Sequence, residues 1–264
     1  MAQEASTFQK LMRRAGLLGG VALVVVLGVL GWQWQASIQL DAIDIVGAQH
    51  AEAEELRSLA AVRPDTALYD IEPALVSDRV TRHPWVEAAT TYRLPTGTLR
   101  ISVTERTPVA LALAADGTPA FYLDRQGYCM PLVKGMGADV PLLRGLSADD
   151  YHPVRPLQHA SVRAMMDALA ASDVQEITSE LEVRPDSSMA LMTRPTTDHG
   201  AIRVMLGASD FPTRLHRLNA FWHQAVLPQP NTEFDRIDLR FDSQIVTREQ
   251  KTSAAGSPKI AGSR

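Results

Sequence analysis

The sequence predicts an α+β protein: one N-terminal transmembrane helix followed by two modest domains rich in strands. Three observations carry this prediction. A long uncharged apolar run lies near the start, the next stretch of about 70 residues reads strand-helix-helix-strand-strand, and the remainder holds more alternating segments than helical ones. The chain has 264 residues, a length that suits one anchor and one or two domains.

The apolar run predicts a transmembrane helix over residues 15–34. Residues 17–30 carry no charged or strongly polar side chain, and ten of them are Leu or Val. About 20 apolar residues cross the hydrocarbon core of a bilayer. Trp32 and Trp34 follow the run, as aromatic anchors at a membrane interface do.

The charges around this run predict its orientation. Three basic residues lie just before it: Lys10, Arg13 and Arg14. No Lys or Arg follows before Arg57, and the more basic flank of a membrane helix stays in the cytoplasm. Residues 1–14 are therefore expected to be a cytoplasmic tail, with the rest of the chain on the other side.

A cleaved signal peptide has the same order of basic, apolar and polar segments. Its cleavage site needs small residues at the last and third-last positions. Ala36 is preceded two places earlier by Trp34, and Ser37 by Gln35. An uncleaved anchor is therefore the favoured interpretation. A buried soluble helix is disfavoured because the run has no polar edge.

The stretch after the anchor has the pattern β-α-α-β-β. Two helices can cover one face of a three-stranded sheet and leave the other face in water. Leu75, Val76 and Val80 are expected on one helix face, and Trp85 is expected to be buried against the helices. The expected strands are 37–46, 85–93 and 98–106. The expected helices are 51–61 and a second one whose first turn contains Pro73 and which His83-Pro84 ends.

Residues 108–248 predict a mixed, mostly antiparallel β domain with two helices. The expected strands are 109–113, 120–123, 177–183, 189–193, 201–206, 234–241 and 244–248, and the expected helices are 156–171 and 211–226. Residues 249–264 are rich in Lys, Ser, Ala and Gly and are expected to be a disordered tail.

Short motifs occur in the same order as in a known family. They are His83-Pro84-Trp85-Val86, Arg93-Leu94-Pro95, Val103-Thr104-Glu105-Arg106-Thr107-Pro108, Tyr122-Leu123-Asp124-Arg125-Gln126-Gly127 and the late run 234–241. Together they resemble the FtsQ/DivIB family of bacterial cell division proteins. The resemblance implies a POTRA domain at 38–107 and a β domain at 108–248. It also implies a non-enzymatic scaffold in the inner membrane at the division septum, which links early division components to septal peptidoglycan synthesis.

The sequence offers no catalytic, cofactor or metal site. It contains no nucleophile elbow, phosphate-binding glycine loop, H-E-x-x-H or C-x-x-C motif. His216 and His223 are seven residues apart, too far to close on one metal ion as an i, i+4 pair can. The single cysteine, Cys129, excludes an intrachain disulfide, and the net charge of −4 argues against nucleic acid as a partner.

The last predicted strand is the candidate partner site, because nothing structured is expected to cover its edge. The resemblance implies that FtsB/DivIC- and FtsL-like division proteins bind there. The implied contact residues are Phe241, Ser243, Gln244, Ile245, Val246 and Thr247.

Two points qualify this site. Its residues could instead be ordinary core and turn residues, and the strand phase of Phe241 predicts a ring packed in the core with Ile237 and Leu239. Gln244 stands where many relatives have Gly, so the pairing geometry can differ.

The alternative function is a POTRA-type polypeptide-binding module of a translocation or assembly system. It is disfavoured because such systems carry several tandem POTRA units.

Overall fold

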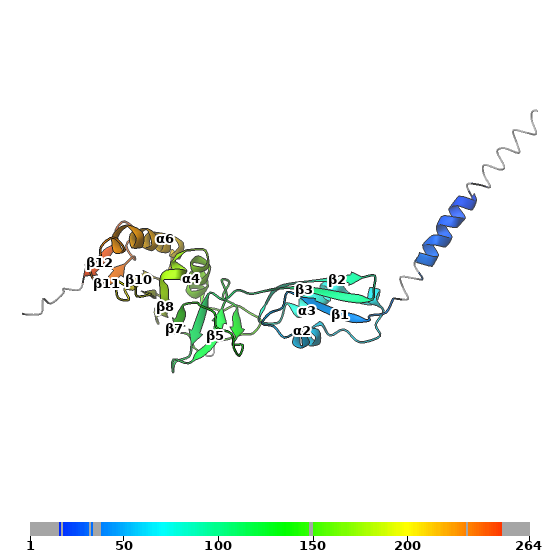
Figure 1. The fold of residues 1–264 in the computed structure, drawn as a ribbon, viewed down its shortest axis with the longest axis horizontal. Coiled ribbons are helices and arrows are strands. Elements are labelled where there is room, and N and C mark those ends of the chain that lie inside the picture. The colour runs from blue at the N-terminus through cyan, green and yellow to red at the C-terminus, as the bar shows by residue number, and fades with distance from the viewer. Residues whose placement is uncertain are drawn as a thin grey trace, which may run out of the picture. The chain divides into compact units, whose positions relative to one another are not determined.

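The computed structural model describes residues 16, 18–31, 33, 38–147, 150–230 and 232–249. The chain divides into two compact units, Met1–Glu105 and Arg106–Arg264 (Figure 1). The predicted cytoplasmic tail, 1–14, and nearly all of the predicted disordered tail lie outside the described residues.

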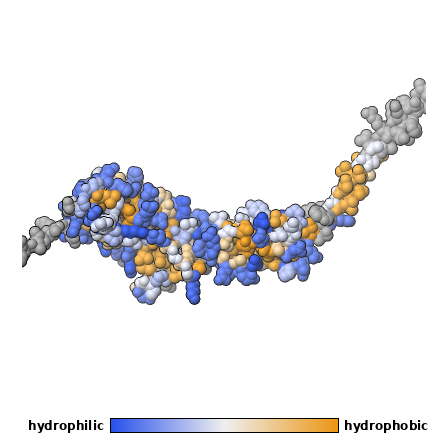
Figure 2. Space-filling view, in the orientation of Figure 1, coloured by the Kyte–Doolittle hydropathy of each residue, from blue (hydrophilic) through white to orange (hydrophobic). Residues whose placement is uncertain are grey.

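Residues 18–31 are helical, as are Gly16 and Gln33. The large apolar side chains of this helix are exposed, which Figure 2 shows as a strongly hydrophobic segment; they are Leu18, Val21, Leu23, Val24, Val25, Val26, Leu27, Val29 and Leu30. Within the described part of the chain, no helix reaches both the length and the apolarity needed to span a membrane. Four residues of the predicted transmembrane helix, 15, 17, 32 and 34, are outside that part, so this helix stays a prediction.

The first unit has the predicted order of elements and a three-stranded sheet in the order β1-β3-β2. Strand β1 runs parallel to β3, and β2 runs antiparallel to β3. The elements are β1 (Ala42–Val46), α2 (Ala53–Ala60), a 3₁₀ turn (Leu68–Asp70), α3 (Pro73–Val80), β2 (Val86–Leu94) and β3 (Thr98–Glu105).

Alternation along β3 explains the layers of this unit. Leu99, Ile101 and Val103 are buried, as predicted. The core that they share includes Leu56 and Ala60 of α2 and Val76 and Val80 of α3, each pair one helical turn apart and therefore on one face. The prediction for Leu75 is wrong: its side chain is exposed. It lies about 100° around the helix from Val76, outside the buried stripe.

Gly47 ends β1 with a positive φ of +89°, a conformation that glycine adopts without strain. A Cβ atom there would collide with the carbonyl oxygen of Val103. Glycine thus allows the chain to turn closely over β3. The following residues, 49–51, can then reach the end of that strand.

The second unit is built on a nine-stranded mixed sheet in the order β12-β11-β10-β9-β8-β7-β4-β5-β6 (Figure 1). Three of its strand pairs are parallel: β4 with β7, β7 with β8, and β10 with β11. The strands are β4 (Ala110–Leu113), β5 (Pro119–Leu123), β6 (Cys129–Pro131), β7 (Leu142–Arg144), β8 (Thr178–Val183), β9 (Met189–Thr193), β10 (Arg203–Gly207), β11 (Phe234–Asp238) and β12 (Val246–Glu249). The helices are α4 (Ala160–Ala170), α5 (Val174–Ile177) and α6 (Phe211–Phe221), which continues into a π-helical turn (Trp222–Val226).

Helices α4 and α6 contact each other and contribute to one hydrophobic core with the sheet. The predicted apolar stripe of α4 is confirmed as core and consists of Val162, Met165, Met166 and Leu169. From α6, Leu215 and Leu218 join it, together with Ile237 of β11. Because Ile237 is anchored in this core, β11 gives β12 a fixed neighbour.

The strand boundaries at the C-terminal end of the sheet differ from the predictions. Strand β11 ends at Asp238 instead of residue 241, and β12 covers Val246–Glu249 instead of residues 244–248. Glu249, predicted to open the disordered tail, is the last residue of β12. Apolar alternation at 237, 239 and 241 continues past the point where the backbone leaves the sheet, so the pattern alone overestimated β11.

Candidate partner-binding edge

Strand β12 is the terminal strand of the nine-stranded sheet. It pairs antiparallel with β11, with Asp238 opposite Val246 and Ile237 opposite Thr247. Among the described residues no strand pairs with its other side. That side therefore presents backbone N–H and C=O groups that another chain can use.

The side chains of β12 are all exposed: Val246, Thr247, Arg248 and Glu249. Val246 is 43% exposed although it is apolar. Ile245, just before the strand, is half-buried and packs against the core. Ile245 thus anchors the backbone just before β12, while the side chains of β12 itself lie in solvent.

The turn between β11 and β12 is held by several polar contacts. The backbone N–H of Leu239 donates to the carbonyl of Met205 at 3.0 Å, and Leu239 is fully buried. The guanidinium of Arg240 folds back onto Asp238, with its Nη2 2.6 Å from Oδ2. This hydrogen-bonded pairing holds the pKa of Asp238 below its ordinary value, although burial opposes the shift.

Arg217 of α6 fixes the rest of that turn. Its Nη1 donates to the carbonyl of Phe241 and its Nη2 to the carbonyl of Gln244, each at 2.8 Å. One planar guanidinium therefore holds two points of the backbone that leads into β12. Sequence reasoning missed Arg217, because an arginine on the polar face of a helix carries no signal of a partner far along the chain.

The structure brings the six predicted contact residues together in one short segment. Phe241 and Ser243 lie in a bend and Gln244 follows it, Ile245 precedes the strand, and Val246 and Thr247 begin it. The predicted core position of Phe241 is wrong: its side chain is 45% exposed, since β11 has ended three residues earlier and the strand phase no longer applies.

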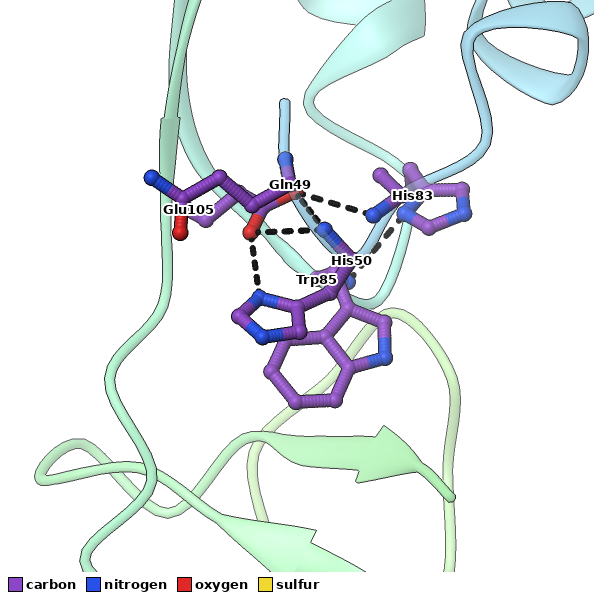
Figure 3. Close-up of polar contacts among 6 residues, drawn as sticks. Gln49, His50, His83, Trp85 and Glu105 are labelled. Carbon is purple, nitrogen blue, oxygen red and sulfur yellow. Dashed lines mark hydrogen bonds and ion pairs between the residues drawn. The ribbon is translucent and has the colours of Figure 1, made fainter. Parts of the chain in front are cut away.

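A second polar cluster lies in the first unit, around the end of β3 (Figure 3). The carboxylate of Glu105 accepts hydrogen bonds from the backbone N–H groups of Gln49, His50 and Ala51, the shortest at 2.8 Å. It also accepts one from the Nδ1 of His50 at 2.7 Å. Burial alone raises the pKa of Glu105, but these hydrogen bonds outweigh it and hold the pKa below its ordinary value.

Trp85 completes this cluster. It is 1% exposed, which confirms that it is buried, and the His50 ring stacks on it with the ring centroids 4.8 Å apart. Its backbone N–H donates to Nδ1 of His83 at 3.2 Å, and Nε2 of His83 lies 3.0 Å from Glu55. Because its members bind one another, the cluster stabilises the fold of this unit and is a weaker candidate for a partner site than β12.

Two further features bear on the chemistry of the chain. Within the described residues no three His, Cys, Asp or Glu side chains gather closely enough to hold a metal ion. Cys129 is buried, and that burial raises the pKa of its thiol, so it behaves as a small core residue.

A β-α-α-β-β unit followed by a mixed sheet whose described terminal strand is open on one side defines a class of proteins built on a POTRA domain and an appended β domain. Residues 39–106 match the family described as "POTRA domain, FtsQ-type". Residues 107–248 match the family described as "FtsQ/DivIB, C-terminal related". The chain belongs to the FtsQ/DivIB family.

Full-length relatives agree with these matches. The chain is 47% identical to "Cell division protein FtsQ" of Rhodothermus marinus, over 94% of this chain and 90% of the relative. It is 46% identical to the protein of the same name from Salinibacter ruber, over 89% of this chain and 91% of the relative. A relative from Geobacter sp. strain M21 is 29% identical over 88% of this chain and 85% of its own length.

Proposed function

We propose that this protein is a non-enzymatic, single-pass membrane scaffold of the bacterial division apparatus. Its family membership and its similarity to relatives named cell division protein support a role in division. In this role the protein links early division components to septal peptidoglycan synthesis. It works by binding other proteins and performs no chemistry of its own.

The open edge of β12 is the observation that carries the binding proposal. An extended segment of a partner adds to this edge as a further strand, with main-chain hydrogen bonds for affinity and side-chain contacts for specificity. The proposed partners are FtsB/DivIC- and FtsL-like division proteins. The contact surface comprises Phe241, Ser243, Gln244, Ile245, Val246 and Thr247.

The turn before β12 supports this proposal through pre-organisation. Arg217 and the Asp238–Arg240 pair hold the backbone between the two strands. The edge is therefore already formed before a partner strand binds, so binding costs little conformational entropy. The exposed Phe241 and Val246 add apolar area beside the main-chain contacts.

The membrane part of the proposal rests on the uncharged run at 17–30 and on the exposed Leu and Val side chains of the helical residues 18–31. The basic residues before the run put the N-terminus in the cytoplasm and both folded units outside it. A reporter active only outside the cytoplasm should therefore be active when fused after Arg106 and inactive when fused before Leu11. Recovery of a soluble chain shortened near Ala36 would contradict the anchor.

Binding is tested with the full chain solubilised from membranes. It is titrated separately with the purified FtsB/DivIC-like and FtsL-like proteins of the same cell, and then with both together. The proposal expects saturable binding of at least one of them and loss of that binding when the chain is truncated after Gln244. Equal binding by the truncated chain would move the site away from β12.

A further inference from the structure

Strands β10, β11 and β12 align three arginines in one row across the sheet (Figure 1). Arg203 of β10 lies opposite Arg236 of β11, and Arg236 lies opposite Arg248 of β12. We call these three residues the arginine row. It ends on the strand whose open edge is proposed to receive a division partner. A strand added to that edge would place one of its own residues next in the row.

The arginine row lies on the sheet face that points away from the core. Ile237 of β11 belongs to the core that α4 and α6 share with the sheet. Side chains alternate between the two faces of a strand, so its neighbour Arg236 points to the opposite face, together with Arg248. Both arginines are exposed. Val246 lies two residues before Arg248 on the same face and is exposed as well.

Two of these charges are poorly compensated within the chain. Like charges directly opposite each other destabilise a sheet, and Arg236 and Arg248 stand in that position. Arg236 makes no hydrogen bond or ion pair with any other described residue, and Nε of Arg248 lies 3.9 Å from Oδ2 of Asp235. The carboxylate of Asp238, next on the same face of β11, is already bound by Arg240 at 2.6 Å. The open edge therefore carries positive charge that is available to an anionic group.

Arg203, the third member of the row, shows how an arginine on this face binds a carboxylate. Its Nη1 donates to Oε2 of Glu182 at 3.0 Å. Glu182 belongs to β8, and β9 lies between β8 and β10, with the small Ala190 opposite Glu182. An arginine here thus reaches a carboxylate one strand beyond its neighbour. For Arg236 the neighbour is β12, and the strand beyond it is the added strand of a partner.

We propose, resting on the binding function proposed for β12, that the partner strand carries an acidic residue directly opposite Arg248 and an apolar residue two positions away, opposite Val246. Arg248 and Arg236 both bind the carboxylate, and the planar guanidinium group suits this contact. The spacing is two because alternate residues of a strand share one face. The two arginines then discriminate between partners, since a segment with Lys or Arg in this position is repelled.

Charge reversal in the full chain, solubilised from membranes, tests the proposal. Arg248→Glu and Arg236→Glu are each titrated with the FtsB/DivIC-like or FtsL-like protein that the parent chain binds. Each change should weaken binding by about three- to twenty-fold at low salt, because an attraction becomes a repulsion. The difference from the parent should shrink as the salt concentration rises. Arg155→Glu is the matched control: Arg155 is an exposed arginine of the same unit outside the sheet, and its variant should bind like the parent.

Thermal unfolding of the same variants separates a contact role from a structural role. In the free chain Arg248→Glu replaces the repulsion between the two opposite arginines by an attraction to Arg236. Its Tm should therefore equal or exceed that of the parent. Weaker binding by a chain that is at least as stable as the parent identifies Arg248 as a contact residue. A lowered Tm together with weaker binding would make Arg248 a structural residue and contradict the proposal.

Charge exchange between the two proteins identifies the partner's acidic residue. Each Asp or Glu of the partner's binding segment is changed to Lys and titrated against the parent chain and against Arg248→Glu. One of these Lys variants should bind Arg248→Glu more tightly than it binds the parent, because the exchanged charges attract again. The residue two positions from this acidic residue, on one side of it, should be apolar, and its change to Ser should weaken binding to the parent chain.

The outcomes distinguish this proposal from the proposed function. If truncation after Gln244 abolishes binding but both arginine variants bind like the parent, β12 receives the partner and the acidic contact is wrong. The acidic contact is also wrong if Arg155→Glu weakens binding as much as Arg248→Glu, since only the net charge would then matter, or if no Lys variant of the partner prefers Arg248→Glu. If the truncated chain binds as well as the parent, the function proposed for β12 fails, and the contact fails with it.

Discussion

The polar cluster around Glu105, which we call the Glu105 corner, and the turn before β12 both contain hydrogen-bonded charged side chains, but these side chains serve different purposes in the two places. At Glu105 a carboxylate, two imidazoles and an indole bind one another, and the indole of Trp85 and the ring of His83 are buried. At β12 the polar contacts hold the backbone of the turn, while Phe241 and the strand after it remain in solvent. The comparison teaches that polar contacts can stabilise a folded core in one place and hold the backbone beside an open sheet edge in another.

The largest expected effect is at Trp85. Trp85→Ala removes a fully buried aromatic ring and should lower the free energy of unfolding of the first unit by about 3–5 kcal/mol. Tyr92→Ala, an exposed aromatic in the same unit, is the control and should cost less than about 1 kcal/mol. Denaturant unfolding measures both. A loss below about 1 kcal/mol for Trp85→Ala would mean that the corner contributes little to the fold.

Glu105→Gln should have the next largest effect. The variant keeps one oxygen acceptor but loses the charge that binds three backbone N–H groups and His50, which should lower the free energy of unfolding by about 1.5–3 kcal/mol. Glu87→Gln, an exposed carboxylate of the same unit, is the matched control and should change it by less than about 0.5 kcal/mol. Equal effects of the two changes would contradict the structural role of Glu105.

Phe241→Ala should separate binding from stability. The ring is exposed, so its loss should change the free energy of unfolding by less than about 0.5 kcal/mol. It should weaken partner binding by about 2 kcal/mol or more, as the loss of a contact anchor does. Titration and thermal unfolding of the same variant measure the two effects. A destabilised variant with unchanged binding would make Phe241 a fold residue, as its strand phase had suggested.

The smallest expected effect is the pH dependence of the stabilisation by Glu105, which should be negligible near neutral pH. A pKa lowered by folding gives stability that is fully present above the unfolded pKa and is lost as the pH falls through the folded value. The difference in unfolding free energy between the parent and Glu105→Gln should therefore be constant near pH 7. It should shrink below about pH 4.3, the usual pKa of a glutamic acid. A constant difference down to pH 3 would contradict this origin.

The sequence predicts the elements of the first unit well, because their periodicity comes from one buried face. Leu99, Ile101 and Val103 alternate in the sequence and are buried in the structure. It predicts the C-terminal edge less well. Leu239 lies beyond the end of β11, yet its side chain is buried in the core and its N–H donates to the Met205 carbonyl. The apolar alternation therefore continues past the last residue of the strand.

Parts of the candidate site could not be read from the chain at all. The hydrogen bonds from Arg217 join residues 24 and 27 positions apart, and no local pattern encodes such contacts. Strands β6 and β7 have three residues each, too few for a period of two to be seen. These two short strands are defined by their hydrogen bonds to neighbouring strands of the folded sheet, which the local sequence does not reveal.

The most direct test of the binding edge is a pair of proline variants in β12, Val246→Pro and Thr247→Pro. Ile245 is not used because it precedes the strand and packs against the core. In an antiparallel strand adjacent N–H groups point to opposite sides, so one proline removes an outward donor and the other breaks a bond to β11.

Titration with the partner and thermal unfolding of each variant are the measurements, with Thr247→Ala as the control that keeps its N–H. One proline variant should fold like the parent and lose partner binding, while the other should unfold more easily. Thr247→Ala should bind and fold like the parent. If both proline variants fold and bind like the parent, β12 does not receive the partner and the proposed edge is wrong.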